Sequence, residues 1–525
     1  MDLGIDFGTT RTVVAYADRG NYPVVSFDDE AGDSFDWFPS VVAARGEELA
    51  FGWSAIAVEG DPAWTQARSF KRLLAGARAD GEVDLGGERF GVAALVARFL
   101  EALHHALRTR STLATELARP CAPRAVVATP ANAFCTQRFV TLDAFRRAGF
   151  DVAAMLAEPS AAGFEYAHRH ARTITSNREH VIVYDLGGGT FDASLVKMSG
   201  AHHDALTTSG IARLGGDDFD RALAELAGER AGLRVDALGD HARGRLLQHC
   251  RELKERLNPS SRKITVDLEA ALGSAAPVAE IAIAVDDYYA AVAPLVERTI
   301  DAMAPVIDRL AGEVPRGPED DPLGEVAGVY VVGGASALPL VGRMLRARFG
   351  RRVHRSPYPH AAIAIGLAIA AEGAAHGGSG YALSDRFSRN FGVFRESEGG
   401  AAATYDPIFT RETPLPAPGA KVSVARRYRA AHDVGHYRFF ECSSFDDGGA
   451  PRGDIAPTTD VLFAFDPALR AGGVDLATWP VRRLAQRGPL VEERYEVDAH
   501  GIVELTITDL ESGFAKTQTL GARVA

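Results

Sequence analysis

Residues 181–192 read VIVYDLGGGTFD, and residues 3–12 read LGIDFGTTRT. In both stretches an apolar run ends in an aspartate, a glycine-containing turn follows, and a threonine comes next. Glycine in such a turn lets the backbone approach a phosphate and leaves its N–H groups free to donate. Each aspartate, Asp6 and Asp185, can face a hydrated Mg²⁺. The repetition, together with YVVGGAS at 330–336, predicts a two-sided clamp for a nucleoside triphosphate.

The composition is ordinary for a globular protein. The chain has 525 residues, of which 46% are hydrophobic and 24% charged, which allows roughly two to four domains. The net charge of -12 argues against a nucleic-acid-binding protein, which usually carries a basic patch. The longest apolar run, Ala361–Ala371, is far shorter than the roughly 20 residues that a membrane helix needs. No secretory signal is visible, so we expect a cytoplasmic protein without a membrane partner.

The cysteines are few, stand far apart and form no CxxC pair. This spacing argues against a structural zinc site and favours a reducing compartment. They are Cys121, Cys135, Cys250 and Cys442.

Strand-like and helix-like patterns alternate through the first part of the chain, which predicts α/β layers. The expected helices include Ala67–Ala75, Val92–Arg108 and a long one over Asp286–Leu310. The sequence becomes rich in Gly and Ala at Glu372–Gly380, where we place the domain boundary. Beyond it, alternating runs separated by Gly, Pro and Asp turns predict a β domain of about 140 residues.

A series of motifs resembles the DnaK-type (seventy-kilodalton heat-shock) molecular chaperone family, whose nucleotide-binding domain shares the actin and sugar-kinase fold. The motifs are GIDFGTT at 4–10, FPSVV at 38–42, FKRLL at 70–74, VVATPANAF at 126–134, EPSAAG at 158–163, YDLGGGTFD at 184–192, LGGDDFD at 214–220, VVGGAS at 331–336 and PHAAIAIGLA at 359–368. The resemblance implies an α/β, actin-like two-lobed ATPase domain over residues 1–378. It further implies an interdomain linker at 379–388 and a small β-sandwich substrate-binding-like domain at 389–525.

The resemblance continues more weakly into the C-terminal part, in LSDRFSRNFGV at 383–393, IFTRETPLP at 408–416 and YEVDAHGIVELTITD at 495–509. In the family a helical lid follows the β sandwich, whereas this sequence ends at Ala525. We therefore expect an atypical member without the lid, from which a bound client leaves quickly, since differences in affinity are mostly differences in off-rate.

The resemblance also implies the ligands and the site residues. The ligands are ATP and ADP with Mg²⁺, and K⁺ is a further candidate ion. The implied catalytic residues are Lys71, Glu158, Thr190 and Asp192, and the implied metal residues are Asp6 and Asp185. The implied nucleotide-binding residues are Gly8, Thr9, Thr10, Arg11, Gly187, Gly188, Gly189, Gly215, Gly216, Lys254, Asn258, Gly333, Gly334 and Ala335. Phosphoryl transfer needs mainly positioning and electrostatic stabilisation, which one lysine and one metal can largely supply.

Some of these residues have an ordinary structural alternative. Glu158 precedes a helix and would then only cap it. Lys71 alone is the kind of lysine found on a solvated surface, and its assignment depends on the FKRLL motif. Pro130 and Arg138 match a pair that relays the nucleotide state between domains in the family. The alternative for that pair is a strand-ending proline and a helix-surface arginine.

Around the adenine the chain departs from the family pattern. Lys254 is kept, but Arg251 stands where a Glu is expected and Glu255 where many members have an Arg. Ala337 replaces the arginine that stacks on the base, and His360 replaces an Asp. Loss of a guanidinium–base stack costs about 1–2 kcal/mol, so we expect weaker or less base-selective nucleotide binding.

The surfaces for partners also differ from the family. Ala154 and Ala157 replace the Arg and Asn of the J-domain docking surface, and the leucines of the linker have become Tyr381–Ser384, although Asp385 is kept. These changes predict looser interdomain coupling, or a dedicated J-domain co-chaperone and exchange factor. The stretch 424–440 is basic where the family grips an apolar peptide, so the client pocket cannot be placed residue by residue.

The leading expectation is an ATP-binding and ATP-hydrolysing chaperone-like protein that couples its nucleotide state to binding of a protein client. The second is a nucleotide-dependent switch or adaptor with little general folding activity. The EPSAAG and LGGDDFD motifs and the β domain argue against a sugar kinase of the same fold. The long β extension argues against a filament-forming bacterial actin.

Overall fold

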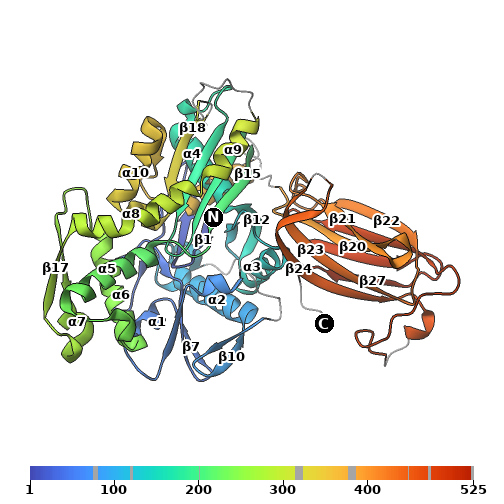
Figure 1. Cartoon of the computed structure of the whole chain (residues 1–525), viewed down its shortest axis with the longest axis horizontal. Helices are drawn as coiled ribbons and strands as arrows, with labels where there is room; N and C mark the ends of the chain where they lie inside the picture. The colour runs from blue at the N-terminus through green and yellow to red at the C-terminus, as the bar shows by residue number, and fades with distance from the viewer. Residues whose placement is uncertain are drawn as a thin grey trace.

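The computed structural model describes residues 1–74, 81–118, 122–199, 202–313, 323–324, 326–376, 386–446, 448–470 and 474–521. Figure 1 shows a large α/β part, coloured blue to yellow, with a β sandwich in orange and red beside it. The α/β part contains two five-stranded sheets, one in each of two lobes, as in the actin fold. The predicted fold class is therefore confirmed.

Each lobe is built around one of the two glycine-turn hairpins. In the first lobe the strand order is β12-β11-β1-β2-β5, and the antiparallel hairpin β1–β2 lies beside the parallel strands β11 and β12. In the second lobe the order is β15-β14-β13-β18-β19, and the hairpin β13–β14 lies beside the parallel strands β18 and β19. The strands are β1 (Asp2–Phe7), β2 (Arg11–Tyr16), β5 (Phe38–Pro39), β11 (Arg124–Thr129), β12 (Asp151–Ala157), β13 (His180–Leu186), β14 (Phe191–Ser199), β15 (His202–Ile211), β18 (Val326–Val332) and β19 (Val353–Arg355).

Two helices, α4 (Glu158–His170) and α11 (Ala362–His376), pack between the sheets. Small residues allow a close approach here: a Cβ on Gly4 of β1 would lie 2.3 Å from the Ala364 carbonyl oxygen. A Cβ on Gly366 would lie 1.8 Å from the Ala161 carbonyl oxygen. The side chains of α11 from Ala362 to Ala371 are buried all round, as an apolar run without periodicity predicts. Across the described ranges, the structure contains no helix long and apolar enough to cross a membrane.

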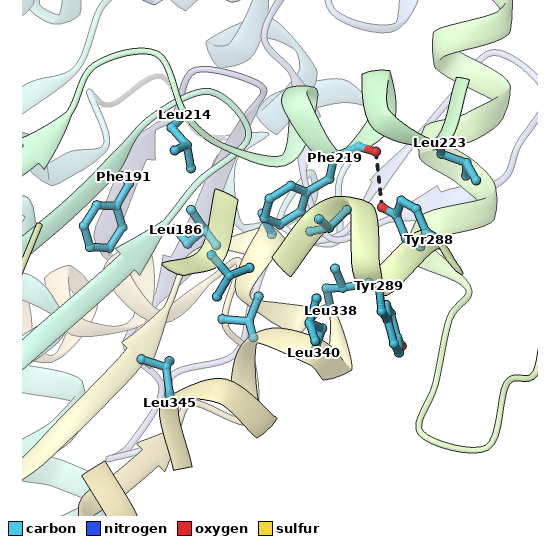
Figure 2. Packing of buried hydrophobic residues seen from close by; sticks show 14 of the residues in the cluster. Leu186, Phe191, Leu214, Phe219, Leu223, Tyr288, Tyr289, Leu338, Leu340 and Leu345 are labelled. Atoms are coloured by element: carbon cyan, nitrogen blue, oxygen red, sulfur yellow. Dashed lines mark hydrogen bonds between the residues drawn. The ribbon is translucent and has the colours of Figure 1, made fainter. Parts of the chain in front are cut away.

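Further helices surround the two sheets or, like α6 and α7, pack beside the small β16–β17 sheet of the second lobe. They are α2 (Val92–Thr109), α3 (Cys135–Arg147), α5 (Gly216–Ala231), α6 (Asp240–Glu255), α7 (Leu268–Leu272), α8 (Val285–Asp301), α9 (Ala304–Glu313) and α10 (Pro339–Phe349). In the second lobe Phe219 of α5 is fully buried against α8 (Figure 2). The Tyr288 hydroxyl of α8 donates to the backbone carbonyl oxygen of Phe219 at 3.2 Å. The buried tyrosine hydroxyl therefore has a hydrogen-bond partner.

Short elements complete the α/β part. They are β3 (Phe27–Asp28), β4 (Ser34–Phe35), β6 (Val41–Arg45), β7 (Glu48–Phe51), α1 (Trp53–Ala57), β8 (Thr65–Arg68), β9 (Glu82–Leu85), β10 (Glu88–Gly91), β16 (Lys263–Asp267) and β17 (Glu280–Ala284).

Two helix predictions are wrong. The segment Ala67–Ala75 contains the end of β8 and a 3₁₀ turn over Phe70–Leu74, because Ser69 adopts a positive φ of 59° that no α-helix allows. Its last residue lies outside the described residues. The long helix over Asp286–Leu310 is two helices, α8 and α9, which are separated at Ala302 and Met303. Pro305 lies in the first turn of α9, where the N–H that proline lacks would have no partner within the helix, whereas Pro294 is accommodated inside α8.

The C-terminal part is a sandwich of two four-stranded antiparallel sheets, with orders β21-β20-β23-β24 and β22-β25-β26-β27. The strands are β20 (Asn390–Ser397), β21 (Ala402–Phe409), β22 (Val422–Arg429), β23 (Val434–Phe445), β24 (Pro451–Ala464), β25 (Leu490–Val497), β26 (Val503–Asp509) and β27 (Ala515–Thr519). Alternate residues of β26 are buried, as period-two patterning predicts. The predicted linker over 379–388 lies mostly outside the described residues, including Asp385 and Tyr381–Ser384.

Candidate nucleotide site

The two glycine turns lie on either side of one cavity between the lobes. The cavity has a volume of about 150 Å³, and both turns contribute to its wall. The turns approach so closely that a Cβ on Gly188 would lie 2.2 Å from the Thr10 hydroxyl oxygen. That hydroxyl is buried and has no hydrogen-bond partner among the described residues. A buried hydroxyl without a partner, beside turns rich in glycine, suits the oxygens of a phosphate chain.

Buried charged groups gather at the same cavity. Lys71 donates to Glu158 at 2.9 Å, and the two side chains are only 11% and 18% exposed. The interpretation of Lys71 as a solvated lysine is therefore wrong. Glu158 begins α4, but no side-chain capping bond forms at this helix end, so pairing with Lys71 is the interaction that the side chain makes.

The ionisation of these groups is strongly perturbed. Burial raises the pKa of Asp6 to about 7. The charge of Lys71 acts to lower this pKa, and the charge of Glu158 acts to raise it. Burial and Glu158 together raise the pKa of Asp192 to about 8. Burial, Glu158 and the neighbouring aspartates raise the pKa of Asp185 well above its ordinary range. Burial alone would lower the pKa of Lys71, but Glu158 and Asp6 hold it above the ordinary value.

This donor set fits a divalent cation. Asp6 and Asp185 are the next-to-last residues of β1 and β13, and both line the cavity. Carboxylates held close together in a buried site repel one another, and a hard cation such as Mg²⁺ prefers oxygen ligands of this kind. The donor type suits Mg²⁺, although the described residues contain no cluster of three or more His, Cys, Asp or Glu side chains that would hold a metal ion by themselves.

The predicted glycines divide into two groups. Gly8, Gly187, Gly188, Gly216, Gly333 and Gly334 line the cavity, together with Thr9, Thr190 and Ala335. Gly189 and Gly215 are not part of its wall. A Cβ on Gly189 would lie 1.6 Å from an Arg72 nitrogen, and a Cβ on Gly215 would lie 2.7 Å from the Gly187 carbonyl oxygen. The absence of a side chain at these two glycines allows the second turn to pack closely against Arg72 and against the segment at Gly215.

The predicted base-binding residues on α6 are largely engaged with the protein. Lys254 pairs with Asp220 at 2.5 Å and donates to the Gly216 carbonyl oxygen at 2.9 Å. Arg251 pairs with Asp217 at 2.8 Å and with Asp220 at 3.0 Å. These arginine and lysine side chains therefore support the start of α5 beside the phosphate turns.

The other residues that the sequence predicts to face the base lie around a second cavity of about 640 Å³. Asn258, Ala337 and His360 line it. The Asn258 amide oxygen accepts from the backbone N–H of Ser260 at 3.0 Å, which ties it to its own turn. Burial and the neighbouring Arg11 lower the pKa of His360, so this side chain is neutral near pH 7.

Sequence reasoning missed Arg72 and Asp217 as site residues. Arg72 donates to the Gly189 carbonyl oxygen at 2.8 Å and lies 3.7 Å from Asp217. Both residues lie inside motifs that the sequence offered, FKRLL and LGGDDFD. Their roles depend on which turns meet across the cleft. The spacing of the motifs along the sequence does not predict those contacts.

The β sandwich contacts the first lobe through α3. Arg138 is 2% exposed, so the alternative of a surface arginine is wrong. It donates to the Thr129 hydroxyl at 3.2 Å and twice to the His500 carbonyl oxygen, at 2.9 and 3.0 Å. Pro130, the next residue after Thr129, borders a small cavity that is also lined by Glu158, Asp185 and Asp192. Thr129 and Pro130, which are adjacent in the chain, thus lie between a cavity shared with the carboxylates and an arginine that binds a loop of the β sandwich.

Further hydrogen bonds join the first lobe to the C-terminal part of the chain. The Cys135 backbone N–H donates to the buried Glu441 carboxylate at 2.9 Å, and the Ser388 hydroxyl donates to the Ala133 carbonyl oxygen at 2.7 Å. The Arg389 guanidinium lies 4.1 Å from the centre of the Phe134 ring. The interface thus includes specific polar contacts at the start of α3, beside apolar packing of Ile502 on the first lobe and of Cys135 on the sandwich.

Comparisons with known proteins agree with this architecture. A family model described as "Hsp70 protein" matches residues 75–385. The chaperone protein HscA of Pectobacterium carotovorum is 31% identical over 389 residues, which cover 71% of this chain and 58% of that protein. An HscA homolog of Burkholderia multivorans is 32% identical over 439 residues, which cover 79% and 65% of the two chains. The chain thus spans less than two thirds of the length of these relatives. Because the family model covers more than half of its residues, and as the motifs predict, the chain belongs to the Hsp70 protein family.

Proposed function

We propose that this protein binds ATP and ADP in the cleft between its lobes and hydrolyses ATP to ADP and phosphate. The observation that carries this proposal is the meeting of two glycine turns at a single cavity whose wall also contains Lys71 and the carboxylates of Asp6, Glu158, Asp185 and Asp192. Its relatives, which are named chaperones, support the same class of activity. A bound Mg²⁺, held through Asp6 and Asp185, would neutralise charge on the phosphates. K⁺ is a further candidate ion for the same site.

Different residues of the cavity have different roles in the proposed hydrolysis. Backbone N–H groups and hydroxyls of the turns, including Thr9, Thr10 and Thr190, hold the phosphate oxygens. Lys71, fixed by Glu158, places a positive charge beside the γ-phosphate. Asp192 orients the water whose oxygen attacks the γ-phosphorus, while the bond to the bridging oxygen breaks.

We further propose that residues 1–378 form the nucleotide domain and 389–525 a client-binding domain, joined by a linker at 379–388. The contact of Arg138 with Thr129 and His500 supports coupling between the two. A protein client is the proposed partner, with a dedicated J-domain co-chaperone and an exchange factor. The free thiols of Cys135, Cys250 and Cys442 support a reducing compartment such as the cytoplasm.

A switch or adaptor without general folding activity is the second candidate, and the interior of the sandwich favours it. Arg395 pairs with Glu493 at 2.6 Å and with Asp406 at 2.6 Å. Glu493 is fully buried and also accepts from the Tyr495 hydroxyl at 2.5 Å. A buried charged network of this kind contrasts with the apolar pocket that would grip a general unfolded peptide.

The two candidates differ in the response of hydrolysis to a client. The test measures phosphate release by the full chain with and without an unfolded protein, and repeats it with Arg138→Ala. For a coupled chaperone, the client raises the rate in the intact chain and loses this effect in Arg138→Ala. If the intact chain hydrolyses ATP at a rate that no client changes, the adaptor function replaces the chaperone function. If the chain releases no phosphate above background, the proposal of an ATPase is wrong.

A further inference from the structure

The cavity on the base side extends well beyond the phosphate turns. Its volume is about 640 Å³, compared with about 150 Å³ between the turns, and both cavities share Lys254, Glu255 and Ala335 as wall residues. Small residues keep it open: Ala337 ends at Cβ, and a Cβ on Gly342 would meet no atom within 4 Å. The space therefore continues past the turn after β18 to the exposed face of α10.

The far wall of this cavity is basic. Arg343 and Arg346 lie three residues apart on α10 and so share one face of the helix, and Arg355 ends β19. The Arg343 guanidinium lies 4.8 Å from the centre of the Tyr289 ring, which fixes it at the cavity. Within the described ranges, none of the ion pairs involves any of these three arginines.

The carboxylates of the wall do not balance this charge. Glu255 is engaged by Arg11 at 2.7 Å, which leaves Asp286 as the other acidic residue among the described residues that line the cavity. Burial and the neighbouring Arg346 lower the pKa of Arg355, which shows that cations crowd one another at this wall. An anion is the group that such a wall would favour.

We propose that this cavity takes a nucleotide whose nucleoside end carries an additional phosphate, held by Arg343, Arg346 and Arg355. Guanidinium groups suit this ligand because their planar N–H donors match phosphate oxygens. The inference rests on the proposed function, because the other end of the nucleotide must lie in the phosphate turns. It assigns the preferred nucleotide class of that same site.

The test compares binding of ADP, adenosine 3′-phosphate 5′-diphosphate and its 2′-phosphate isomer to the full chain with Mg²⁺, by calorimetry. We expect at least one isomer to bind about tenfold more tightly than ADP, with the advantage shrinking as salt is raised. The two isomers show which ribose oxygen carries the phosphate. In Arg343→Ala and in Arg355→Ala, the ratio of the affinity for the tighter-binding isomer to the affinity for ADP should fall towards one.

Arg348→Ala is the matched control, because Arg348 is an exposed arginine of α10 that does not line the cavity. The control should keep the full ratio. Equal affinity for ADP and both isomers would overturn the inference while leaving the proposed function in place. A chain that binds neither ATP nor ADP would overturn the proposed function, and the inference with it. An affinity ratio that is lost equally in Arg348→Ala would also overturn the inference.

Discussion

Arg11 of the first phosphate turn and Glu255 at the end of α6 form an ion pair across the mouth of the cleft, with nitrogen–oxygen distances of 2.7 and 2.9 Å. The Arg11 guanidinium also lies 4.4 Å from the centre of the Trp37 ring. One partner belongs to the first lobe and the other to the second, so the pair joins the lobes over the cavity where we place the nucleotide.

Breaking this pair should speed the release of nucleotide. The side chains are 25% and 42% exposed, and a pair of this kind contributes about 0.2–1 kcal/mol. We therefore expect Glu255→Ala to release a fluorescent ADP about two- to fivefold faster in stopped flow. Glu252→Ala, an exposed change on the same helix, is the control. Equal release rates in Glu255→Ala and the intact chain would show that the pair does not hold the lobes together.

Restoring the missing arginine should tighten nucleotide binding. Ala337 lines the larger cavity, and the resemblance to the family implies that an arginine at this position would stack on the adenine. We expect Ala337→Arg to lower the Kd for ADP by roughly 5- to 30-fold, measured by calorimetry. Ala347→Arg adds the same charge on the exposed face of α10 and should change little. If both variants bind ADP with the same Kd as the intact chain, the alanine at position 337 does not weaken nucleotide binding.

Arg138 should hold the β sandwich against the first lobe. It makes one buried hydrogen bond, to Thr129, and two part-buried ones, to His500, and loss of such charge-assisted bonds costs about 2 kcal/mol. Arg138→Ala is expected to shift the chain towards a more extended form, seen as a larger radius of gyration in small-angle scattering. Arg147→Ala, an exposed change on the same helix, should leave the radius unchanged. An unchanged radius in Arg138→Ala would exclude Arg138 as the anchor.

Asp509 should stabilise the sandwich in a pH-dependent manner. Burial alone would raise its pKa, but hydrogen bonds from Ser512 and Arg470 lower it to about 2. The ionised form is therefore favoured by folding, and its contribution of about 2 kcal/mol is present above pH 4 and lost as the pH falls towards 2. Asp509→Asn should weaken hydrogen-exchange protection of β26 at pH 7. The exposed Asp460→Asn is the control, and an equal loss of protection in both variants would contradict this role.

The repeated hairpins and their carboxylates could be predicted from sequence because each motif is local. A strand, an aspartate, glycines and a threonine determine the turn by themselves, so Asp6 and Asp185 could be assigned from the order of residue types alone. The same is true of α11, whose run of small apolar residues predicts burial on all sides.

The remaining features depend on contacts between distant segments. The partner of Arg11 is 244 residues away, and the basic wall at Arg343 and Arg355 arises only when α10 and β19 meet. Lys254 looked like a base-binding lysine, but Asp220 and the Gly216 carbonyl oxygen engage it. The sequence does not predict the break between α8 and α9, because apolar periodicity continues through it and the stretch contains two prolines, of which Pro294 lies inside α8 and Pro305 near the start of α9.

Phosphate release from ATP by the intact chain and by Lys71→Ala tests the central claim most directly, with Lys263→Ala as an exposed lysine control. Removing a positioned cation from phosphoryl transfer typically lowers the rate by about a hundredfold or more. The account predicts slow hydrolysis by the intact chain and by Lys263→Ala, and none above background by Lys71→Ala. Equal hydrolysis by all three chains, or no hydrolysis by the intact chain with Mg²⁺, would contradict it.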